Sequence, residues 1–172
     1  MADIQAPAFT PPTFTPPTFT PPTFTPKDPD FEARVRASFG RQGIMTLIGA
    51  RLIRVAPGWV EIELPFRADL TQQHGFFHAG ITSTIADSAG GYAAYSLMPA
   101  GTSVLTTEFK INLLAPADGE LLRAHGRVIK PGRTLTVCEV DVFAVKDGRT
   151  TPCAKLLETL MCLDGRPDGP GE

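Results

Sequence analysis

The sequence predicts an α+β fold in which a curved antiparallel sheet wraps around one long central helix. Three observations carry this prediction. Residues 79–97 contain a single charged side chain, Asp87, as expected for a helix that is buried nearly all round. Several segments alternate apolar and polar residues with the period of a strand. Asp-Gly and Pro-Gly turn signals separate the later segments, which favours antiparallel hairpins.

The first 26 residues are set apart by their composition. Phe-Thr-Pro-Pro-Thr occurs at 9–13, 14–18 and 19–23 and breaks off at 24–26. Regular prolines remove backbone donors and favour polyproline II, and a five-residue period suits neither helix nor strand. We therefore expect a disordered Pro-rich arm over residues 1–27, one folded domain over 28–165, and a flexible tail over 166–172.

The order of elements in the domain is a short helix, a strand, a loop, the long helix and then a meander of four strands. The short helix shows apolar residues every four positions and stops at Gly40. This order is typical of the hot-dog architecture. The expected bounds are 30–40, 59–64, 72–78, 79–97, 104–114, 121–129, 135–145 and 153–163.

Composition and charge limit the classes of function. The 172 residues are 42% hydrophobic and 20% charged, enough for one substantial core. A net charge of −2 gives no general attraction to nucleic acid or anionic lipid. The odd number of cysteines, without C-x-x-C spacing, favours a reducing compartment. We expect a cytoplasmic protein without a leader or membrane span, and without nucleic-acid or membrane partners.

The loop before the long helix and the lone acid within it indicate chemistry. An ionised carboxylate is costly to bury without a partner, so Asp87 is a candidate base or nucleophile. The helix is expected to begin near residue 78, which leaves the N–H groups of Ala79 and Gly80 unpaired at its positive end. Such donors can hold an oxyanion. Gln72 adds a side-chain donor, and Gly75 marks tight backbone in the loop.

The spacing of these groups has a geometric consequence. Asp87 follows Ala79 by eight residues, or about 12 Å along a helix axis. One reacting carbonyl cannot touch both groups of the same chain. Two antiparallel copies of the helix across a two-fold axis would place the start of one beside the middle of the other. If both groups serve one site, the protein is a homodimer with two shared sites, and a further pairing into a tetramer is left open.

The motif Gln72-x-x-Gly75-x-x-His78-Ala79-Gly80, followed by Asp87, resembles a known family. The family pattern is Asn-x-x-Gly-x-x-His-Gly-Gly…Asp of hot-dog acyl-CoA thioesterases of the phenylacetyl-CoA thioesterase (PaaI-like) type. Residues 108–117 and 130–134 resemble this family too, so that the resemblance covers residues 30–163. It implies hydrolysis of an acyl-CoA, with an aryl or a medium- or long-chain acyl group, and no cofactor besides the coenzyme A of the substrate.

The resemblance also implies roles for individual residues. Asp87 would activate water or attack the thioester, while the Ala79 N–H and the Gln72 side chain polarise the carbonyl. His78 would shape the loop and assist at the thioester, and Thr106 would position the water or the acid. Two positions depart from the family, because Gln72 replaces Asn and Ala79 replaces Gly.

Further residues would contact the rest of the substrate. Gly75 and Gly80 bracket the loop that approaches it, and Lys130 and Arg133 flank a Pro-Gly turn where they would meet the coenzyme A phosphates. Arg127 is a weaker candidate for the same role. No metal site is expected.

Two other functions fit the sequence less well. A hot-dog hydroxyacyl dehydratase or hydratase would use a loop His with a helical acid, as His78 and Asp87 could. A non-catalytic acyl-CoA-binding protein would bind the ligand without turnover. A merely structural role of Asp87 as a buried acid is the remaining alternative.

Overall fold

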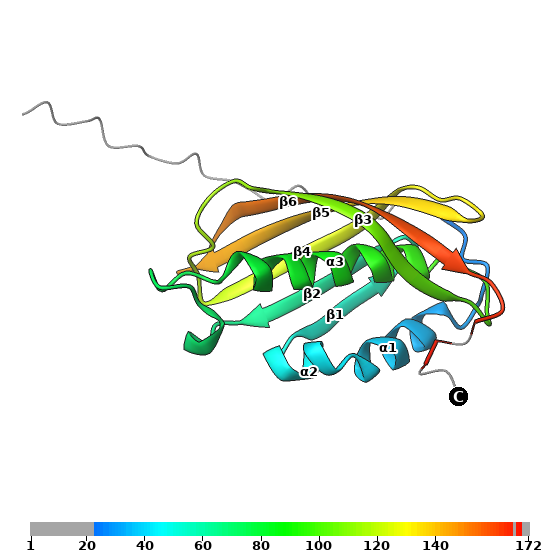
Figure 1. Cartoon of the computed structure of the whole chain (residues 1–172), viewed down its shortest axis with the longest axis horizontal. Helices are drawn as coiled ribbons and strands as arrows, with labels where there is room; N and C mark the ends of the chain where they lie inside the picture. The colour runs from blue at the N-terminus through cyan, green and yellow to red at the C-terminus, as the bar shows by residue number, and fades with distance from the viewer. Residues whose placement is uncertain (1–22, 167, 170–172) are drawn as a thin grey trace, which may run out of the picture.

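The computed structural model describes residues 23–166 and 168–169, and it has the predicted architecture. A six-stranded antiparallel sheet curves around the long helix α3, while two short helices lie beside β1 (Figure 1). The elements are α1 Phe31–Arg41, α2 Gly43–Ile48, β1 Arg51–Ala56, β2 Trp59–Pro65, the 3-10 helix η1 Ala68–Leu70, α3 Ala79–Tyr95, β3 Ser103–Leu113, β4 Leu121–Lys130, β5 Leu135–Lys146 and β6 Arg149–Leu163.

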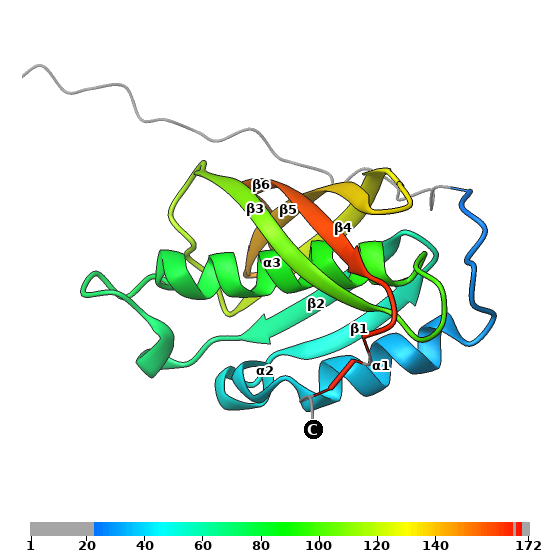
Figure 2. The same cartoon turned by 45° about the vertical axis from the view of Figure 1, so that its right-hand side comes forward.

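The strand order of the sheet is β1-β2-β4-β5-β6-β3. The expected meander is therefore confirmed for β4, β5 and β6 and wrong for β3, which pairs with β6 and not with β4. Figure 2 shows β3 crossing in front of α3 to reach the far edge of the sheet. β3 thus forms one free edge of the sheet and β1 the other.

Helix α3 is buried over most of its length because its residues are small. Its second half, together with the residues as far as Met98, is buried, whereas the first turn is exposed. The sheet approaches closely at Gly126 of β4, where a Cβ atom would lie 2.2 Å from the carbonyl oxygen of Ala89. Asp87 is half-buried within this apolar helix.

The C-terminal end of α3 is held by α1. Arg34 donates hydrogen bonds to the carbonyl oxygens of Met98 at 2.7 Å and Pro99 at 3.0 Å, and its guanidinium lies 4.3 Å from the centre of the Tyr95 ring. An ion pair with Asp28 at 2.8 Å orients it. A cation at the negative end of a helix is favourable, so α1 and α3 are fixed to each other at this point.

Several predicted bounds shift by a few residues. The helix expected to stop at Gly40 continues to Arg41, and α2 and β1 were not predicted. The last strand begins at residue 149 because Asp147 and Gly148, with φ of 48° and 71°, form the tight turn of a long hairpin. The alternation of the strand at 59–64 is confirmed, since its apolar residues at 60, 62 and 64 are buried.

The last Phe of the Pro-rich repeat, Phe24, contacts the folded domain. Residues 1–22 lie outside the described residues, so the arm over 1–27 and the tail over 166–172 remain predictions. Phe24 is described and packs against the core beside Gly58; a Cβ atom on Gly58 would lie 2.4 Å from its ring. Within the described residues, no helix is long and apolar enough to span a bilayer.

Candidate active site

The loop of residues 71–78 is a compact turn that presents the side chain of Gln72. The Gly75 N–H donates to the Gln72 carbonyl at 3.0 Å, and the positive φ of 84° at Gly75 turns the following residue back toward Gln72. The Gln72 N–H donates in turn to the Phe76 carbonyl at 2.9 Å. The Gln72 side-chain oxygen accepts from the His74 N–H. Its amide nitrogen is therefore left as a donor for a ligand.

His78 caps the start of α3. Its Nδ1 accepts a hydrogen bond from the Gly80 N–H at 2.9 Å. The expectation that the Gly80 N–H is unpaired is therefore wrong, because a histidine at the N-cap takes this donor. An accepting Nδ1 requires the proton on Nε2, so His78 offers a second donor on its outer nitrogen. Of the described N–H groups in this first turn, the one on Ala79 has no acceptor.

A pocket of about 310 Å³ lies beside this helix start. Gln72 and Ala79 contribute its polar donors, and the remaining lining is largely apolar. A thioester carbonyl bound here would meet the Ala79 N–H at the positive end of α3. The lining residues are Gln72, Phe76, Phe77, Ala79, Thr82, Leu113, Ala115, Pro116, Ala117 and Cys153.

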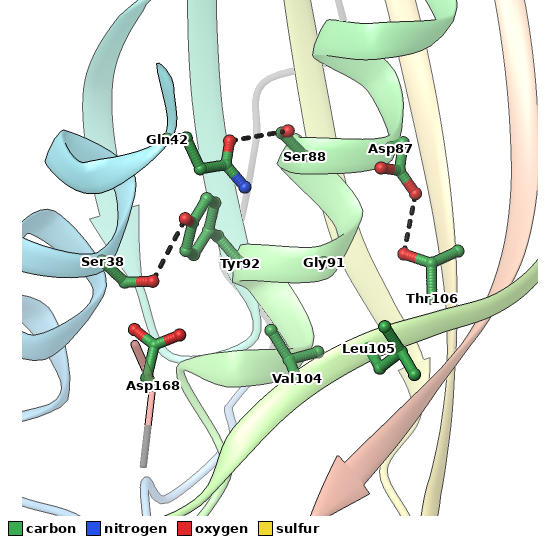
Figure 3. Close-up of a pocket in the computed structure, with 10 residues that line it drawn as sticks. All are labelled: Ser38, Gln42, Asp87, Ser88, Gly91, Tyr92, Val104, Leu105, Thr106 and Asp168. Carbon is green, nitrogen blue, oxygen red and sulfur yellow. Dashed lines mark hydrogen bonds between the residues drawn. The ribbon is translucent and has the colours of Figure 1, made fainter. Parts of the chain in front are cut away.

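Asp87 lies two turns further along the helix and points toward β3. Thr106 Oγ1 donates a hydrogen bond to Asp87 Oδ1 at 2.8 Å (Figure 3). The pairing of β3 with β6 shifts register between Thr106 and Glu108, which marks a β-bulge. Because a bulge re-aims the side chains of its strand, this one places Thr106 against the helix. The structure thus brings together two of the residues expected in the site.

A second pocket, of about 350 Å³, opens beside Asp87. Figure 3 shows hydroxyl groups around it, with Ser38 and the Tyr92 hydroxyl 3.2 Å apart and Ser88 donating to the Gln42 side chain at 3.3 Å. Burial raises the pKa of Tyr92 to about 12, so this phenol stays protonated at neutral pH. The lining residues are Ser38, Gln42, Asp87, Ser88, Gly91, Tyr92, Val104, Leu105, Thr106 and Asp168.

The two pockets have no lining residue in common. Gln72 and Ala79 line one and Asp87 lines the other, and Asp87 follows Ala79 by eight residues, or about 12 Å of helix. In one chain the donors at the helix start and the Asp87 carboxylate are therefore too far apart to contact the same small group. This separation agrees with the geometric expectation from the sequence.

Glu158 of β6 is a carboxyl near Asp87 that sequence reasoning missed. Its exposed fraction is 1%, and it lies between the buried Leu156 and Leu160 on the face of β6 toward the core. The same alternation was readable in the sequence. In the described part of the chain, no N–H or O–H group donates to either Glu158 oxygen.

The cations expected to meet coenzyme A differ in their surroundings. Lys130 and Arg133 are exposed, and within the described residues neither forms an ion pair. Arg127 is instead held by Glu139 at 2.6 Å and by Asp141 at 3.1 Å. These two ion pairs make Arg127 a less suitable phosphate ligand than Lys130 and Arg133.

Comparison with known proteins identifies the family. A family model described as the thioesterase superfamily matches residues 74–151, which include the second half of the loop, α3 and Thr106. A thioesterase family protein from Silicibacter pomeroyi, with a crystal structure, is 50% identical; the match covers 78% of this chain and 99% of that chain, with a TM-score of 0.78. The chain belongs to the thioesterase superfamily. The protein is accordingly a hydrolase of thioester bonds.

Two further matches place this thioesterase within the hot-dog proteins. Human acyl-coenzyme A thioesterase 13 is 29% identical over 99 residues, which are 57% of this chain and 70% of the human protein. The PaaI protein of the phenylacetic acid degradation operon of E. coli is 19% identical, with a TM-score of 0.71. The match covers 80% of this chain and 96% of the PaaI chain. The PaaI match shows the shared fold, and the resemblance to hot-dog thioesterases of this type is confirmed.

Proposed function

We propose that this thioesterase hydrolyses acyl-CoA to a free acid and coenzyme A. The acyl group would be an aryl or a medium- or long-chain group. A relative that carries this activity in its name, human acyl-coenzyme A thioesterase 13, supports the substrate class. Lys130 and Arg133, which are exposed and form no ion pair with the described residues, support it too, because coenzyme A brings phosphates that attract cations.

The reaction would combine the two pockets, each of which would be a half-site: the donors at the helix start lie in one and the Asp87 carboxylate in the other. The thioester oxygen accepts hydrogen bonds from the Ala79 N–H and the Gln72 amide, which stabilise the negative charge that develops on it. Asp87 removes a proton from the attacking water as a general base, and Thr106 orients its carboxylate. The carbon–sulfur bond then breaks, and coenzyme A leaves as the thiolate. The alternative is a direct attack by Asp87 on the thioester carbon. A single turnover in ¹⁸O-labelled water distinguishes this attack from general-base catalysis.

The observation that carries the proposal is the separation of these half-sites along one helix. Since Asp87 and Ala79 of one chain cannot reach the same carbonyl, we infer that the two groups come from different subunits of a homodimer. Antiparallel packing of two α3 helices would complete two sites at once.

The free edge of β3 supports this dimer. Phe109 and Leu113 pair with Glu158 and Ala154 of β6, respectively. Because these two β6 residues are buried, Phe109 and Leu113 belong to the face of the sheet that α3 covers elsewhere. They are nevertheless 47% and 58% exposed. A long edge strand with uncovered apolar side chains is a liability in a monomer. A second copy of the chain, with its α3 and β3 against these residues, would bury them.

The proposed chemistry can be tested by removing one group at a time. Asp87→Asn should lower kcat by roughly 10³-fold, because it deletes the base without changing the shape of the side chain. Ala79→Pro deletes only the N–H, since proline is tolerated at the first position of a helix and follows an extended residue here. It should lower kcat by roughly 10²-fold. Ala79→Ser keeps the N–H and is the matched control; full activity of Ala79→Pro would refute the oxyanion role.

Mixed dimers test the shared site directly. Asp87→Asn and Ala79→Pro chains, co-expressed with different tags, form heterodimers that contain one intact site if each site takes its two groups from different chains. Random pairing should then restore about a quarter of the wild-type activity. If each site lies within one chain, no heterodimer contains an intact site, and the mixture stays as inactive as its parents.

The coenzyme A contacts can be tested with truncated substrates. Lys130→Ala combined with Arg133→Ala should lower kcat/KM for an acyl-CoA about tenfold and leave kcat/KM for the matching acyl-pantetheine unchanged. An equal effect on both thioesters would contradict phosphate binding by these cations. The same assays decide against the other functions, because a dehydratase releases water without a free thiol and a binding protein releases neither.

A further inference from the structure

Glu158 lies beneath the turn of α3 that carries Asp87. Gly90 follows Asp87 by three residues and therefore shares its side of the helix. A Cβ atom on Gly90 would lie 1.5 Å from Glu158 Oε1 and 3.0 Å from a methyl group of Val140. The absence of a side chain at Gly90 thus provides the space into which the Glu158 carboxyl fits.

The Glu158 carboxyl has one polar neighbour that can satisfy it. It is 1% exposed, and no donor within the described residues reaches either of its oxygens. The groups that titrate around it are Asp87 on α3, whose negative charge acts on it, and Cys138, its partner on β5. Two carboxylates can hydrogen-bond to each other only when one of them holds a proton.

The proton belongs to the more deeply buried group. Burial raises the pKa of Glu158 to about 9, and the neighbouring charge of Asp87 and the hydrogen bond to it act in the same direction. Burial likewise raises the pKa of the Cys138 thiol, which stays neutral. At neutral pH the cluster therefore contains a neutral Glu158 beside the Asp87 carboxylate.

We propose that Glu158 is a positioning residue for the thioesterase reaction, whose O–H donates a hydrogen bond to the Asp87 carboxylate from the side of the sheet. This inference rests on the proposed role of Asp87. Thr106 donates from β3 at 2.8 Å, so the carboxylate is held from two directions. An ionised carboxylate has about four acceptor positions, so two remain for water and the substrate. Glu158 itself touches neither.

The test compares two substitutions of Glu158. Glu158→Gln keeps the shape and an N–H donor, and its kcat should stay within about threefold of the wild type. Glu158→Leu removes the donor and should lower kcat by 10- to 100-fold with KM nearly unchanged, because the substrate does not contact this position. Equal kcat in the wild type and a folded Glu158→Leu variant would overturn the proposal.

The pH profile adds a readout that a structural role would not change. As the pH rises toward 9, Glu158 ionises, loses its donor and places a second negative charge beside Asp87. The wild-type kcat should therefore fall on the alkaline side, and this fall should be absent in Glu158→Gln. An alkaline limb that is the same in both proteins would overturn the proposal even if Glu158→Leu does not fold.

Asp87→Asn separates the two levels of inference. If Asp87→Asn is inactive while both Glu158 variants behave like the wild type, the positioning role is wrong and the proposed base stands. If Asp87→Asn keeps normal turnover, the proposed mechanism is wrong, and the role of Glu158 falls with it.

Discussion

The buried carboxyl of Glu158 should make the stability of the fold decrease as the pH rises. The pKa of this group is 4.5 in its reference state and about 9 in the fold. Between these values the folded protein binds one more proton than the unfolded chain, so the free energy of unfolding decreases with pH. Below pH 4.5 both states are protonated and the favourable contribution is complete; above pH 9 both are ionised and it is lost. The slope is about 1.4 kcal/mol per pH unit.

His125 has the opposite effect over part of this range. It lies between the rings of Trp59 and Phe143, and burial, helped by the charge of Arg123, lowers its pKa from 6.5 to about 4. Between pH 4 and 6.5 the unfolded chain binds the extra proton, so stability increases with pH. The two slopes largely cancel up to pH 6.5. Above pH 6.5, the stability decrease caused by Glu158 is no longer offset by His125.

The window from pH 6.5 to 8.5 therefore isolates Glu158. Two pH units at about 1.4 kcal/mol each correspond to about 3 kcal/mol per chain. Urea unfolding followed by circular dichroism, at one protein concentration, should show that the wild type loses about this much more stability across the window than Glu158→Gln. Every other titrating group is present in both proteins and cancels. Equal losses in the two proteins would show that Glu158 is already ionised at pH 6.5, and would refute the reasoning.

Three further substitutions have expected outcomes. Thr106→Val removes the hydrogen bond to Asp87 at constant side-chain volume and should lower kcat about tenfold, with unchanged thermal stability as the control measurement. Gly90→Ala places a methyl group where the Glu158 carboxyl lies, and should both destabilise the fold by about 1–3 kcal/mol and lower kcat; an unchanged kcat would contradict the coupling of these positions. Phe109→Glu puts a charge on the uncovered edge of the sheet and should raise the dimer dissociation constant at least tenfold in sedimentation equilibrium, with loss of activity on dilution.

The sequence was sufficient to predict most of the fold because its patterns are local. A helix with one charge, clean alternation in the strands and Asp-Gly turns each depend on neighbouring residues. The pairing of β3 with β6 is not a local property, since Phe109 meets Glu158 across some fifty residues of chain, and no pattern within a strand specifies its partner. The six-residue helix α2 escaped notice because it is too short to show a period.

In the candidate site too, some features could be predicted from the sequence and others could not. Asp87, Thr106 and the loop could be found because the motif and an isolated charge point to them, and the structure places Thr106 on Asp87 as expected. The pairing of Gly80 with His78 depends on one rotamer at the helix cap, which sequence does not determine. Glu158 was readable in principle, since the alternation through Leu156 directs it inward. A single acid in a largely apolar strand belongs to no motif that would mark it as functional.

The position of β3 in the sheet also has a consequence for the order in which the molecule assembles. β3 follows α3 directly in the chain, yet among the described residues its partner in the sheet is β6, the last strand. Pairing over such a separation requires a long loop to close, and the entropy of closure is lost before the contacts between the two strands can offset it. Thr106 thus joins the sheet only once Leu160 is available to pair with it. The final strand supplies both this partner and Glu158, so a chain that ends before β6 contains Asp87 and Thr106 but lacks Glu158 and the strand that holds Thr106 in the sheet.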